Sequence, residues 1–158
     1  DFDQDLFDTI YNDDSQECEF THKIYGYDNN PQANEIATHN IKAAGVSKDI
    51  VLKLQPFQQF EQPAEKSMII TNPPYGERLS TKEEMFSLYK TIGQVMSENN
   101  TWSFFLLSGY EEAQKAIAAG GDRKKATKNR KIYNGMLKTY LYQYMGEKPP
   151  RRKEREHE

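Results

Sequence analysis

The sequence predicts an α/β protein whose sheet is mainly parallel and ends in an antiparallel hairpin. Three observations lead to this fold class. Short apolar runs alternate with segments of helical periodicity, as expected for parallel strands joined by helices. Residues 67–71 form a mainly apolar run of the kind found in buried parallel strands. Near the end of the chain, two strand-like runs flank Asn134-Gly135, a dipeptide typical of tight hairpin turns.

The first half of the chain is predicted to contain two strands separated by a helix. Residues 1–20 are rich in Asp and aromatic side chains and show no clear period, so they form an acidic approach segment, either a helix or a loop. Residues 23–27 predict a short strand, and residues 50–52 predict a second one.

The helix between these strands has clear start and stop signals. Asn30 is a suitable N-cap, Pro31 suits the first helical position, and Gly45 can end the helix. Apolar residues at helical spacing predict one face that packs on the sheet, formed by Ala33, Ile36, Ala37, Ile41 and Ala44.

The second half of the chain repeats the alternation. Thr81 and Glu84 have the spacing of a capping box, which predicts the start of a helix. The apolar side of this helix consists of Met85, Leu88, Tyr89, Ile92, Val95 and Met96. Residues 102–107 predict a further buried strand, and residues 111–119 a helix that Gly120-Gly121 ends.

The predicted hairpin pairs residues 131–133 with residues 136–144. Asn134 and Gly135 would both take a positive φ, as the central residues of a type I′ turn require. Residues 147–158 contain two prolines and almost only charged side chains, so we expect a disordered tail.

The charge of the chain is distributed unevenly. The formal net charge is −3, but residues 1–65 carry 13 acidic and 4 basic side chains, whereas residues 66–158 carry 17 basic and 11 acidic ones. A local excess of positive charge attracts phosphates and points weakly to nucleic acid. On charge alone, an ordinary solvated surface is the better explanation.

Composition argues against several other classes of protein. Cys18 is the only cysteine, which excludes an internal disulfide and favours a reducing compartment. The histidines show no metal-ligand spacing, so we expect no metal. No apolar run approaches the roughly 20 residues of a membrane span. We therefore expect a cytoplasmic protein that does not contact a membrane.

Four residues with distinct chemistry, Asn72, Pro73, Pro74 and Tyr75, follow directly on the strand 67–71. Ligand sites in open α/β sheets lie at this end of the strands. The Asn72 side-chain oxygen and the Pro73 carbonyl could accept hydrogen bonds from an exocyclic amine and aim its lone pair at an electrophilic methyl group. The prolines would stiffen the loop, and Tyr75 would stack on a base. The alternative is a tight structural loop with a packing tyrosine.

The same four residues carry a family resemblance. Asn-Pro-Pro-Tyr is the hallmark of methyltransferases that act on amino nitrogens of adenine, guanine or glutamine. Residues 71–79 resemble the THUMP-linked family of bacterial 23S ribosomal RNA guanine-N2 methyltransferases. Residues 26–31 are similar to that family's acidic loop after the second strand, and residues 123–137 to its basic segment and terminal hairpin. The resemblance spans residues 23–146.

This resemblance implies a Rossmann-like class I methyltransferase sheet that uses S-adenosyl-L-methionine. Asp28 would accept hydrogen bonds from the ribose hydroxyls of the cofactor, and Asn29 and Asn72 would border the same site. Gln59 stands where the family often has an acidic residue that contacts the adenine. The alternative role for Asp28 is that of a carboxylate at a helix N-terminus.

The resemblance also implies that ribosomal RNA is the partner. Its phosphates would meet the basic residues Arg123, Lys124, Lys125, Lys128, Arg130 and Lys131. A solvated edge strand that lysines protect from aggregation is an equally good explanation of this run.

Two features of the family have no counterpart in this sequence: the first strand with its glycine-rich turn, and the THUMP domain. We therefore expect a fragment, with an acidic approach segment (1–20), a partial methyltransferase domain (21–146) and a charged tail (147–158). The THUMP domain is expected in the missing N-terminal part, and the chain alone is expected not to catalyse methyl transfer.

The leading hypothesis is methylation of the exocyclic N2 of a guanine in large-subunit ribosomal RNA. An adenine-N6 methyltransferase of DNA or RNA shares the four-residue motif. Protein-glutamine methyltransferases also share it but would not need the basic hairpin. A non-catalytic RNA-binding module that keeps the fold without the cofactor is the alternative from a different class.

Overall fold

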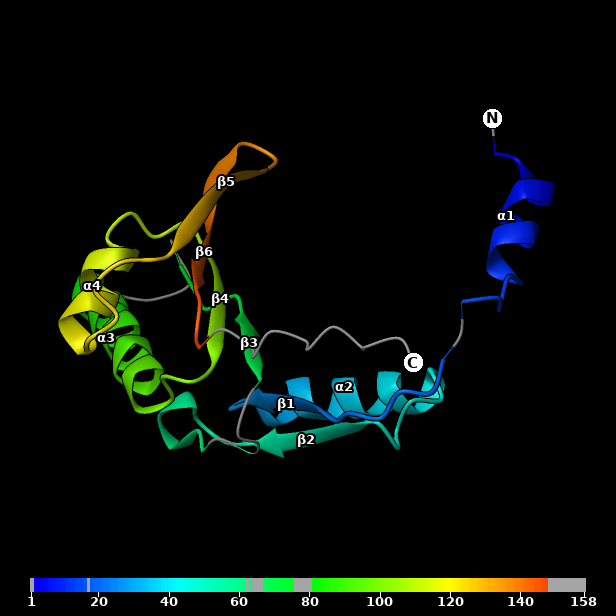
Figure 1. Cartoon of the computed structure of the whole chain (residues 1–158), viewed down its shortest axis with the longest axis horizontal. Helices are drawn as coiled ribbons and strands as arrows, with labels where there is room; N and C mark the ends of the chain where they lie inside the picture. Colours follow the sequence, from blue (N-terminus) through cyan, green and yellow to red (C-terminus); the bar gives the residue numbers. More distant parts are fainter. Residues whose placement is uncertain (1, 17, 62, 64–66, 76–80, 148–158) are drawn as a thin grey trace, which may run out of the picture. The chain divides into compact units, whose positions relative to one another are not determined.

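The computed structural model describes residues 2–16, 18–61, 63, 67–75 and 81–147, which form two compact units, Asp1–Pro56 and Phe57–Glu158 (Figure 1). The elements of the first unit are α1 (Gln4–Tyr11), β1 (Ile24–Asp28), α2 (Pro31–Ala43) and β2 (Ile50–Leu54). Those of the second are η1 (Phe57–Gln59), β3 (Met68–Thr71), α3 (Lys82–Glu98), β4 (Ser103–Ser108), α4 (Ala113–Gly120), β5 (Lys128–Asn134) and β6 (Leu137–Tyr144). No helix in the described ranges is long and apolar enough to cross a membrane.

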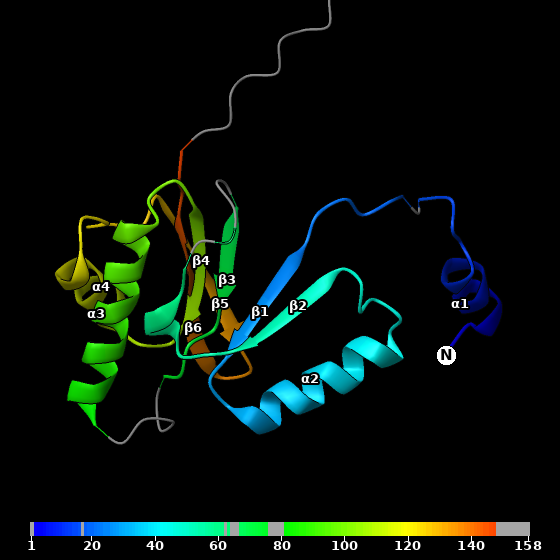
Figure 2. The same cartoon turned by 90° about the horizontal axis from the view of Figure 1, so that it is seen from below.

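The first unit contains a β-α-β motif. Strands β1 and β2 are parallel, with Ile24 paired to Ile50, and α2 packs along them (Figure 2). The Asn30 side chain accepts hydrogen bonds from the backbone N–H groups of Gln32 and Ala33, and Pro31 is the first helical residue. Gly45 follows the helix with a φ of +72°. The predicted start and end of this helix are therefore confirmed.

The acidic approach segment, predicted as either helix or loop, contains helix α1. Asp3 caps it, because its carboxylate accepts a 2.9 Å hydrogen bond from the backbone N–H of Leu6. None of the α1 side chains is buried. The helix therefore depends on its cap and on local contacts, such as the stacked rings of Phe7 and Tyr11.

The predicted packing face of α2 is only partly correct. Ala33, Ala37 and Ile41 are half-buried, but Ile36 is 62% exposed and Ala44 is exposed as well. The physical reason is the width of the sheet: a single pair of strands covers only part of an apolar helical stripe. Among the described residues of the first unit, no apolar side chain is fully buried.

The second unit holds the core. Its sheet has the strand order β3-β4-β6-β5, with β3 and β4 parallel and the remaining pairs antiparallel. Helices α3 and α4 lie on one face of this sheet (Figure 1). The buried side chains of β4 alternate along the strand (Phe104, Leu106 and Ser108), as expected for a strand with one covered face. The predicted α/β class with parallel strands and a terminal hairpin is confirmed.

The capping box at the start of α3 is also confirmed. Thr81 Oγ1 accepts a hydrogen bond from the backbone N–H of Glu84, and the Glu84 carboxylate accepts one from the N–H of Thr81, both at 3.1 Å. Five of the six predicted apolar positions of α3 are buried, and Leu88 is half-buried. Helices α3 and α4 approach each other closely at Gly93. A Cβ at this position would lie only 2.0 Å from the Ile117 carbonyl oxygen.

Strand β3 is less buried than its sequence predicts. Met68 is 59% exposed and Ile70 is 75% exposed, although Ile69 and Thr71 are half-buried. β3 is the edge strand of its sheet and pairs only with β4 within the described part of the chain. An apolar run of this type requires cover on both faces, and helices α3 and α4 provide it on one face only.

The hairpin is confirmed, but its turn differs from the predicted one. Asn134 pairs with Leu137, so Gly135 and Met136 are the two central residues of the turn. Gly135 has a φ of +60°, and no other described residue besides Gly45 has a positive φ. A positive φ at the first central residue alone is the pattern of a type II′ turn and not of type I′. As a result, Met136 occupies the apex of the hairpin.

Two buried tyrosines of this core make a matched pair for mutation. Tyr89 is fully buried and its Oη lies 2.5 Å from the hydroxyl of Ser108, whereas the hydroxyl of Tyr144, also buried, has no hydrogen-bond partner among the described residues. We expect Tyr89→Phe to lower the free energy of unfolding by about 1–2 kcal/mol, because it removes the buried hydrogen bond between the hydroxyls of Tyr89 and Ser108. Tyr144→Phe should be neutral or stabilising. Urea denaturation of both variants is the measurement, and equal effects would contradict the assignment.

The contribution of Tyr89 to the free energy of unfolding should depend on pH. Burial raises the pKa of Tyr89 to about 12, although the hydrogen bond with Ser108 acts in the opposite direction. The folded-state pKa of Tyr89 lies above its unfolded value near 10. The stability that the neutral Tyr89 side chain contributes is therefore complete below about pH 10 and decreases as the pH rises towards 12. Denaturation at pH 8 and pH 11 should show a smaller loss of stability in Tyr89→Phe than in the wild type.

Candidate functional site

The four-residue loop Asn72-Pro73-Pro74-Tyr75 leaves the C-terminal end of β3, as the sequence predicts. The Asn72 side chain is exposed, Pro73 is buried, and the two residues after it are half-buried. The loop thus presents an amide to solvent on a backbone that is anchored in the protein. The remainder of the extended motif, residues 76–79, lies outside the described residues, as does the tail from residue 148.

Tyr89 of helix α3 contacts this loop through its hydroxyl group. Tyr89 Oη lies 3.5 Å from the Pro74 carbonyl oxygen and 2.5 Å from Ser108 Oγ. Ser108 Oγ also accepts a 3.0 Å hydrogen bond from the backbone N–H of Tyr110. One arrangement satisfies every group: the Ser108 hydroxyl donates to Tyr89, and the Tyr89 hydroxyl donates to the Pro74 carbonyl. The last residue of β4 and the middle of α3 together fix one carbonyl of the loop.

The aromatic residue of the loop rests on the end of β4. The Tyr75 ring packs against Gly109, where a Cβ would lie 3.0 Å from Tyr75 Cδ2 and 3.1 Å from Cε2. Any side chain larger than hydrogen at position 109 would therefore displace the ring. The Tyr110 ring lies 5.0 Å from the Tyr89 ring, measured between centroids. The packing alternative considered for Tyr75 is thus present, but it leaves the side chain only half-buried.

Sequence reasoning missed this supporting group of Tyr89, Ser108 and Gly109. Tyr89 was assigned only to the apolar face of a helix, and Ser108 lay beyond the predicted strand. A signal was available: a hydroxyl-bearing residue within an otherwise aliphatic helical face, and a serine on the buried side of an apolar strand, both require hydrogen-bond partners. Their pairing depends on how α3 packs on β4, which local sequence does not reveal.

The predicted cofactor residues are divided between the two units. Asp28 is the last residue of β1 in the first unit, Asn29 follows it, and both are exposed. Gln59 ends the 3-10 helix η1 in the second unit, which also contains Asn72. Asp28 and Gln59 are thus the last residues of their elements, and Asn29 and Asn72 each directly follow a strand.

The Asp28 carboxylate has a defined orientation. Its Oδ1 accepts a 2.7 Å hydrogen bond from the backbone N–H of Asn30, which belongs to the turn that starts α2. The Asp28 carbonyl oxygen accepts from Asn34 Nδ2 and from the backbone N–H of Gln55. A carboxylate offers about four acceptor sites, so the bond with Asn30 leaves acceptor capacity for a pair of hydroxyl donors. A position beside the helix N-terminus and a ligand role are therefore compatible for Asp28.

The structure separates the predicted basic residues into two groups. The Arg123 guanidinium donates to the backbone carbonyls of Met145, Asn100 and Trp102, and Lys124 Nζ donates to those of Ala118 and Gly121. These two side chains hold the turn after α4. The other basic residues, Lys125, Lys128, Arg130 and Lys131, are exposed on β5 or just before it, and β5 is the edge strand of its sheet.

The arrangement can bind a planar polar group at an anchored loop. It offers the exposed amide of Asn72, the half-buried ring of Tyr75 and a basic strand in the same unit. Among the described residues, no group of three or more His, Cys, Asp or Glu side chains could hold a metal ion.

Comparison with known proteins shows the family of the chain. Residues 5–142 match the family described as RMKL-like, methyltransferase domain. YpsC of Bacillus subtilis (strain 168), by its name an RNA methyltransferase, is 36% identical over 133 residues, which are 84% of this chain and 33% of YpsC. The ribosomal RNA large subunit methyltransferase K/L of Marinobacter nauticus is 30% identical over 122 residues, 75% of this chain and 16% of that enzyme.

A solved structure supports the fold. The crystal structure of SMU.472, named as a methyltransferase and complexed with SAH, superposes with a TM-score of 0.78 and 31% identity, covering 94% of this chain and 38% of SMU.472. The chain thus spans a third or less of the length of the two named sequence relatives. With a family match over most of its length and the Asn-Pro-Pro-Tyr loop at the end of a parallel strand, the chain belongs to the RMKL-like methyltransferase domain family.

Proposed function

We propose that the protein containing this chain transfers a methyl group from S-adenosyl-L-methionine to the exocyclic N2 of a guanine in large-subunit ribosomal RNA. The observation that carries the proposal is the loop after β3, where an exposed amide stands on a backbone that Tyr89 and the burial of Pro73 hold in place. The names of the K/L relative and of YpsC support RNA as the substrate. Work on ribosomal RNA implies a cytoplasmic location.

The proposed chemistry requires little from the protein beyond positioning. The cofactor supplies an electrophilic methyl group on its sulfonium sulfur. The Asn72 side-chain oxygen and the Pro73 carbonyl would accept hydrogen bonds from the two N–H groups of the base amine. This interaction favours a pyramidal nitrogen whose lone pair points away from the two acceptors. The new N–C bond forms as the S–C bond breaks, and the extra proton on nitrogen passes to water.

Anchoring of the loop has a direct consequence for this step. A carbonyl acceptor is useful only if its position is fixed before the base arrives, because reorganisation would add to the barrier. Pro73 and Pro74 each lock one φ angle, and Tyr89 donates to the Pro74 carbonyl. Tyr75, held on Gly109, would stack on the base after it leaves its helix or loop.

We propose Asp28, Asn29, Gln59 and Asn72 as the residues of this chain that contact the cofactor. The Asp28 carboxylate suits the ribose hydroxyls, since its orientation is fixed by Asn30 and it retains acceptor capacity. Gln59, as an amide, can accept and donate a hydrogen bond at the adenine edge. A glycine-rich turn of the parent protein would contact the methionine part of the cofactor.

RNA phosphates are proposed to meet Lys125, Lys128, Arg130 and Lys131. Arg123 and Lys124 would contribute positive charge, although their side chains are already engaged with backbone carbonyls. A THUMP domain of the parent protein is the proposed partner that delivers the RNA. An adenine-N6 methyltransferase remains the second candidate, because the four-residue loop serves amino nitrogens of either base.

Asn72 can be tested by catalysis in the full-length protein. Asn72→Ala should lower methyl transfer to large-subunit ribosomal RNA by about 100-fold or more, because it removes one of the two acceptors that activate the amine. Asn100→Ala is the matched control: Asn100 is exposed, follows α3 before the start of β4 and should leave the rate unchanged. Labelled methyl transfer followed by nucleoside digestion identifies the product, and N6-methyladenine in place of N2-methylguanine would overturn the assignment of the base.

Cofactor binding by the chain alone can be measured directly. We expect calorimetric titration of these 158 residues with S-adenosylhomocysteine to show no binding, while the full-length protein binds it. The reason is that this sequence has no glycine-rich turn to receive the methionine part of the cofactor. Clear binding by the isolated chain would show that its pocket is more complete than proposed. Absence of binding in the full-length protein would contradict the cofactor itself.

A further inference from the structure

The outer part of the β5–β6 hairpin carries a regular pattern of rings and charges. In the observed register, Lys131 pairs with Tyr140 and Tyr133 pairs with Lys138. Residues paired across antiparallel strands point to the same face, as do residues two apart along a strand. All four side chains therefore share one face of the hairpin, and each tyrosine lies opposite a lysine.

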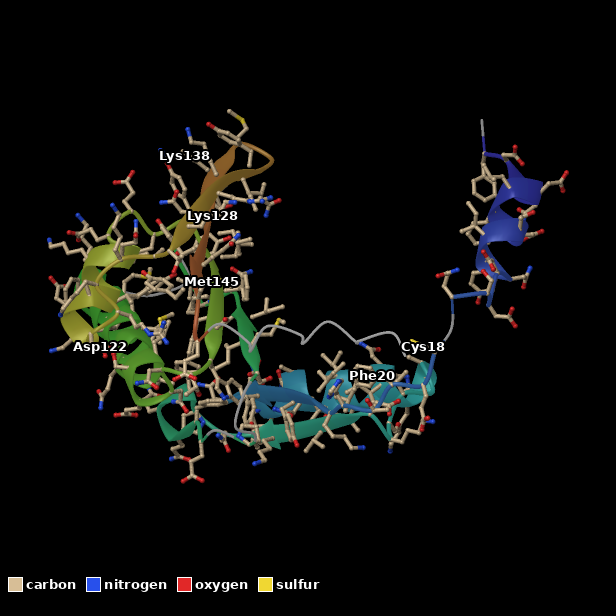
Figure 3. The ribbon with its side chains drawn as sticks, viewed as in Figure 1. Cys18, Phe20, Asp122, Lys128, Lys138 and Met145 are labelled. Atoms are coloured by element: carbon tan, nitrogen blue, oxygen red, sulfur yellow. The ribbon has the colours of Figure 1, made fainter. Side chains whose placement is uncertain are left out.

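These side chains are accessible and partly preorganised. Tyr133 is 63% exposed, and every residue of β5 is exposed. The Tyr140 ring stacks on Tyr142 at a centroid distance of 5.8 Å, and Lys138 Nζ lies 5.6 Å from the Tyr140 centroid. Because Tyr142 is buried in the core, Tyr140 is supported from within the domain. Figure 3 places Lys138 on the outer part of the hairpin, beyond Lys128.

The surroundings of this face favour an anionic partner. Between Asp122 and Glu147 the chain has seven Lys and Arg residues and no Asp or Glu. Two of the seven, Arg123 and Lys124, are bound to backbone carbonyls, which leaves the other five in a segment without acidic side chains. Such a surface attracts phosphate groups.

Protection of an edge strand explains only part of this pattern. Lysines at positions 128 and 131 would indeed prevent edge-to-edge aggregation. That role does not account for the exposed ring of Tyr133 or for Met136, which is fully exposed at the apex of the turn. An edge protected against aggregation would not present these side chains, whereas a surface that contacts nucleobases requires flat or flexible apolar groups beside its cations.

We propose that the face formed by Lys131, Tyr133, Lys138 and Tyr140 is a stacking platform for unpaired nucleotides of RNA. Tyr133 stacks on a base, Tyr140 extends the ring surface towards the core, and the two lysines bind the phosphates on either side. Met136 covers the edge of the stacked base at the apex. This inference rests on RNA being the substrate, as proposed above, and assigns a place where the RNA is held outside the catalytic loop.

The experiment uses the 158-residue chain and separates the contributions of the Tyr133 ring, the Tyr133 hydroxyl and the opposite face of the hairpin. Binding of a fluorescein-labelled, mixed-sequence 12-nucleotide RNA is followed by fluorescence anisotropy. Tyr133→Ala should weaken binding about tenfold, as loss of one stacked base would, and Tyr133→Phe should bind like the wild type because the ring remains. Ile132→Ala is the matched control, since Ile132 lies next to Tyr133 on the opposite face and is 40% exposed. It should leave the affinity unchanged.

Salt dependence separates stacking from charge. Lys131→Gln should reduce the slope of log affinity against log salt by about one, whereas Tyr133→Ala should leave the slope unchanged. The platform is refuted if Tyr133→Ala binds as tightly as Ile132→Ala, if Tyr133→Phe loses as much affinity as Tyr133→Ala, or if the wild-type chain binds no RNA. Methyl transfer by the full-length protein tests the proposed function separately. If the full-length protein methylates RNA and its Tyr133→Ala variant does so at the same rate, the proposed function stands and the platform is refuted.

Discussion

Parallel strands need hydrogen-bonding partners at both edges and apolar cover on both faces. How far each unit meets this requirement determines which of its side chains are buried. In the second unit, α3 and α4 cover one face of the sheet, and the buried half of β4 packs beneath them. The other face is open at β3, where Ile70 is 75% exposed. In the first unit, the two strands and α2 bury no apolar side chain fully. On the proposal that the chain is part of a larger enzyme, these are the surfaces that the remaining domain would cover.

The covered face also determines the geometry of the candidate site. The ring of Tyr89 is buried in the core, and its hydroxyl donates a hydrogen bond to the Pro74 carbonyl of the loop. The packing of α3 on β4 therefore sets the position of this carbonyl. Ser108 completes the connection, because its own hydrogen bond with the Tyr110 backbone fixes its orientation. A loop held in this way keeps its acceptors in place without a ligand. Disturbing the core near Tyr89 would therefore affect the site as well as stability.

The edge opposite β3 has a different character. Strand β5 is exposed along its whole length, and the hairpin ends in a turn whose first central residue is Gly135. Because only that residue takes a positive φ, Met136 lies at the apex and Asn134 remains in the strand. This register fixes which side chains share a face and places Tyr133 opposite Lys138. A turn centred one residue earlier, on Asn134 and Gly135, would instead have paired Tyr133 with Met136 and Lys131 with Lys138.

The sequence by itself determined the features that depend on neighbours a few residues away. Asn30 and Pro31 start α2, Thr81 and Glu84 start α3, and the loop 72–75 follows an apolar strand, all through local hydrogen bonds and fixed backbone angles. Only the tertiary structure decided the contacts between distant segments. These include the tether from Tyr89 to Pro74, the packing of Tyr75 on Gly109 and the binding of Arg123 to the carbonyls of Asn100 and Met145. Local patterns specify that a side chain is apolar or polar, but its partner depends on how helices pack on the sheet.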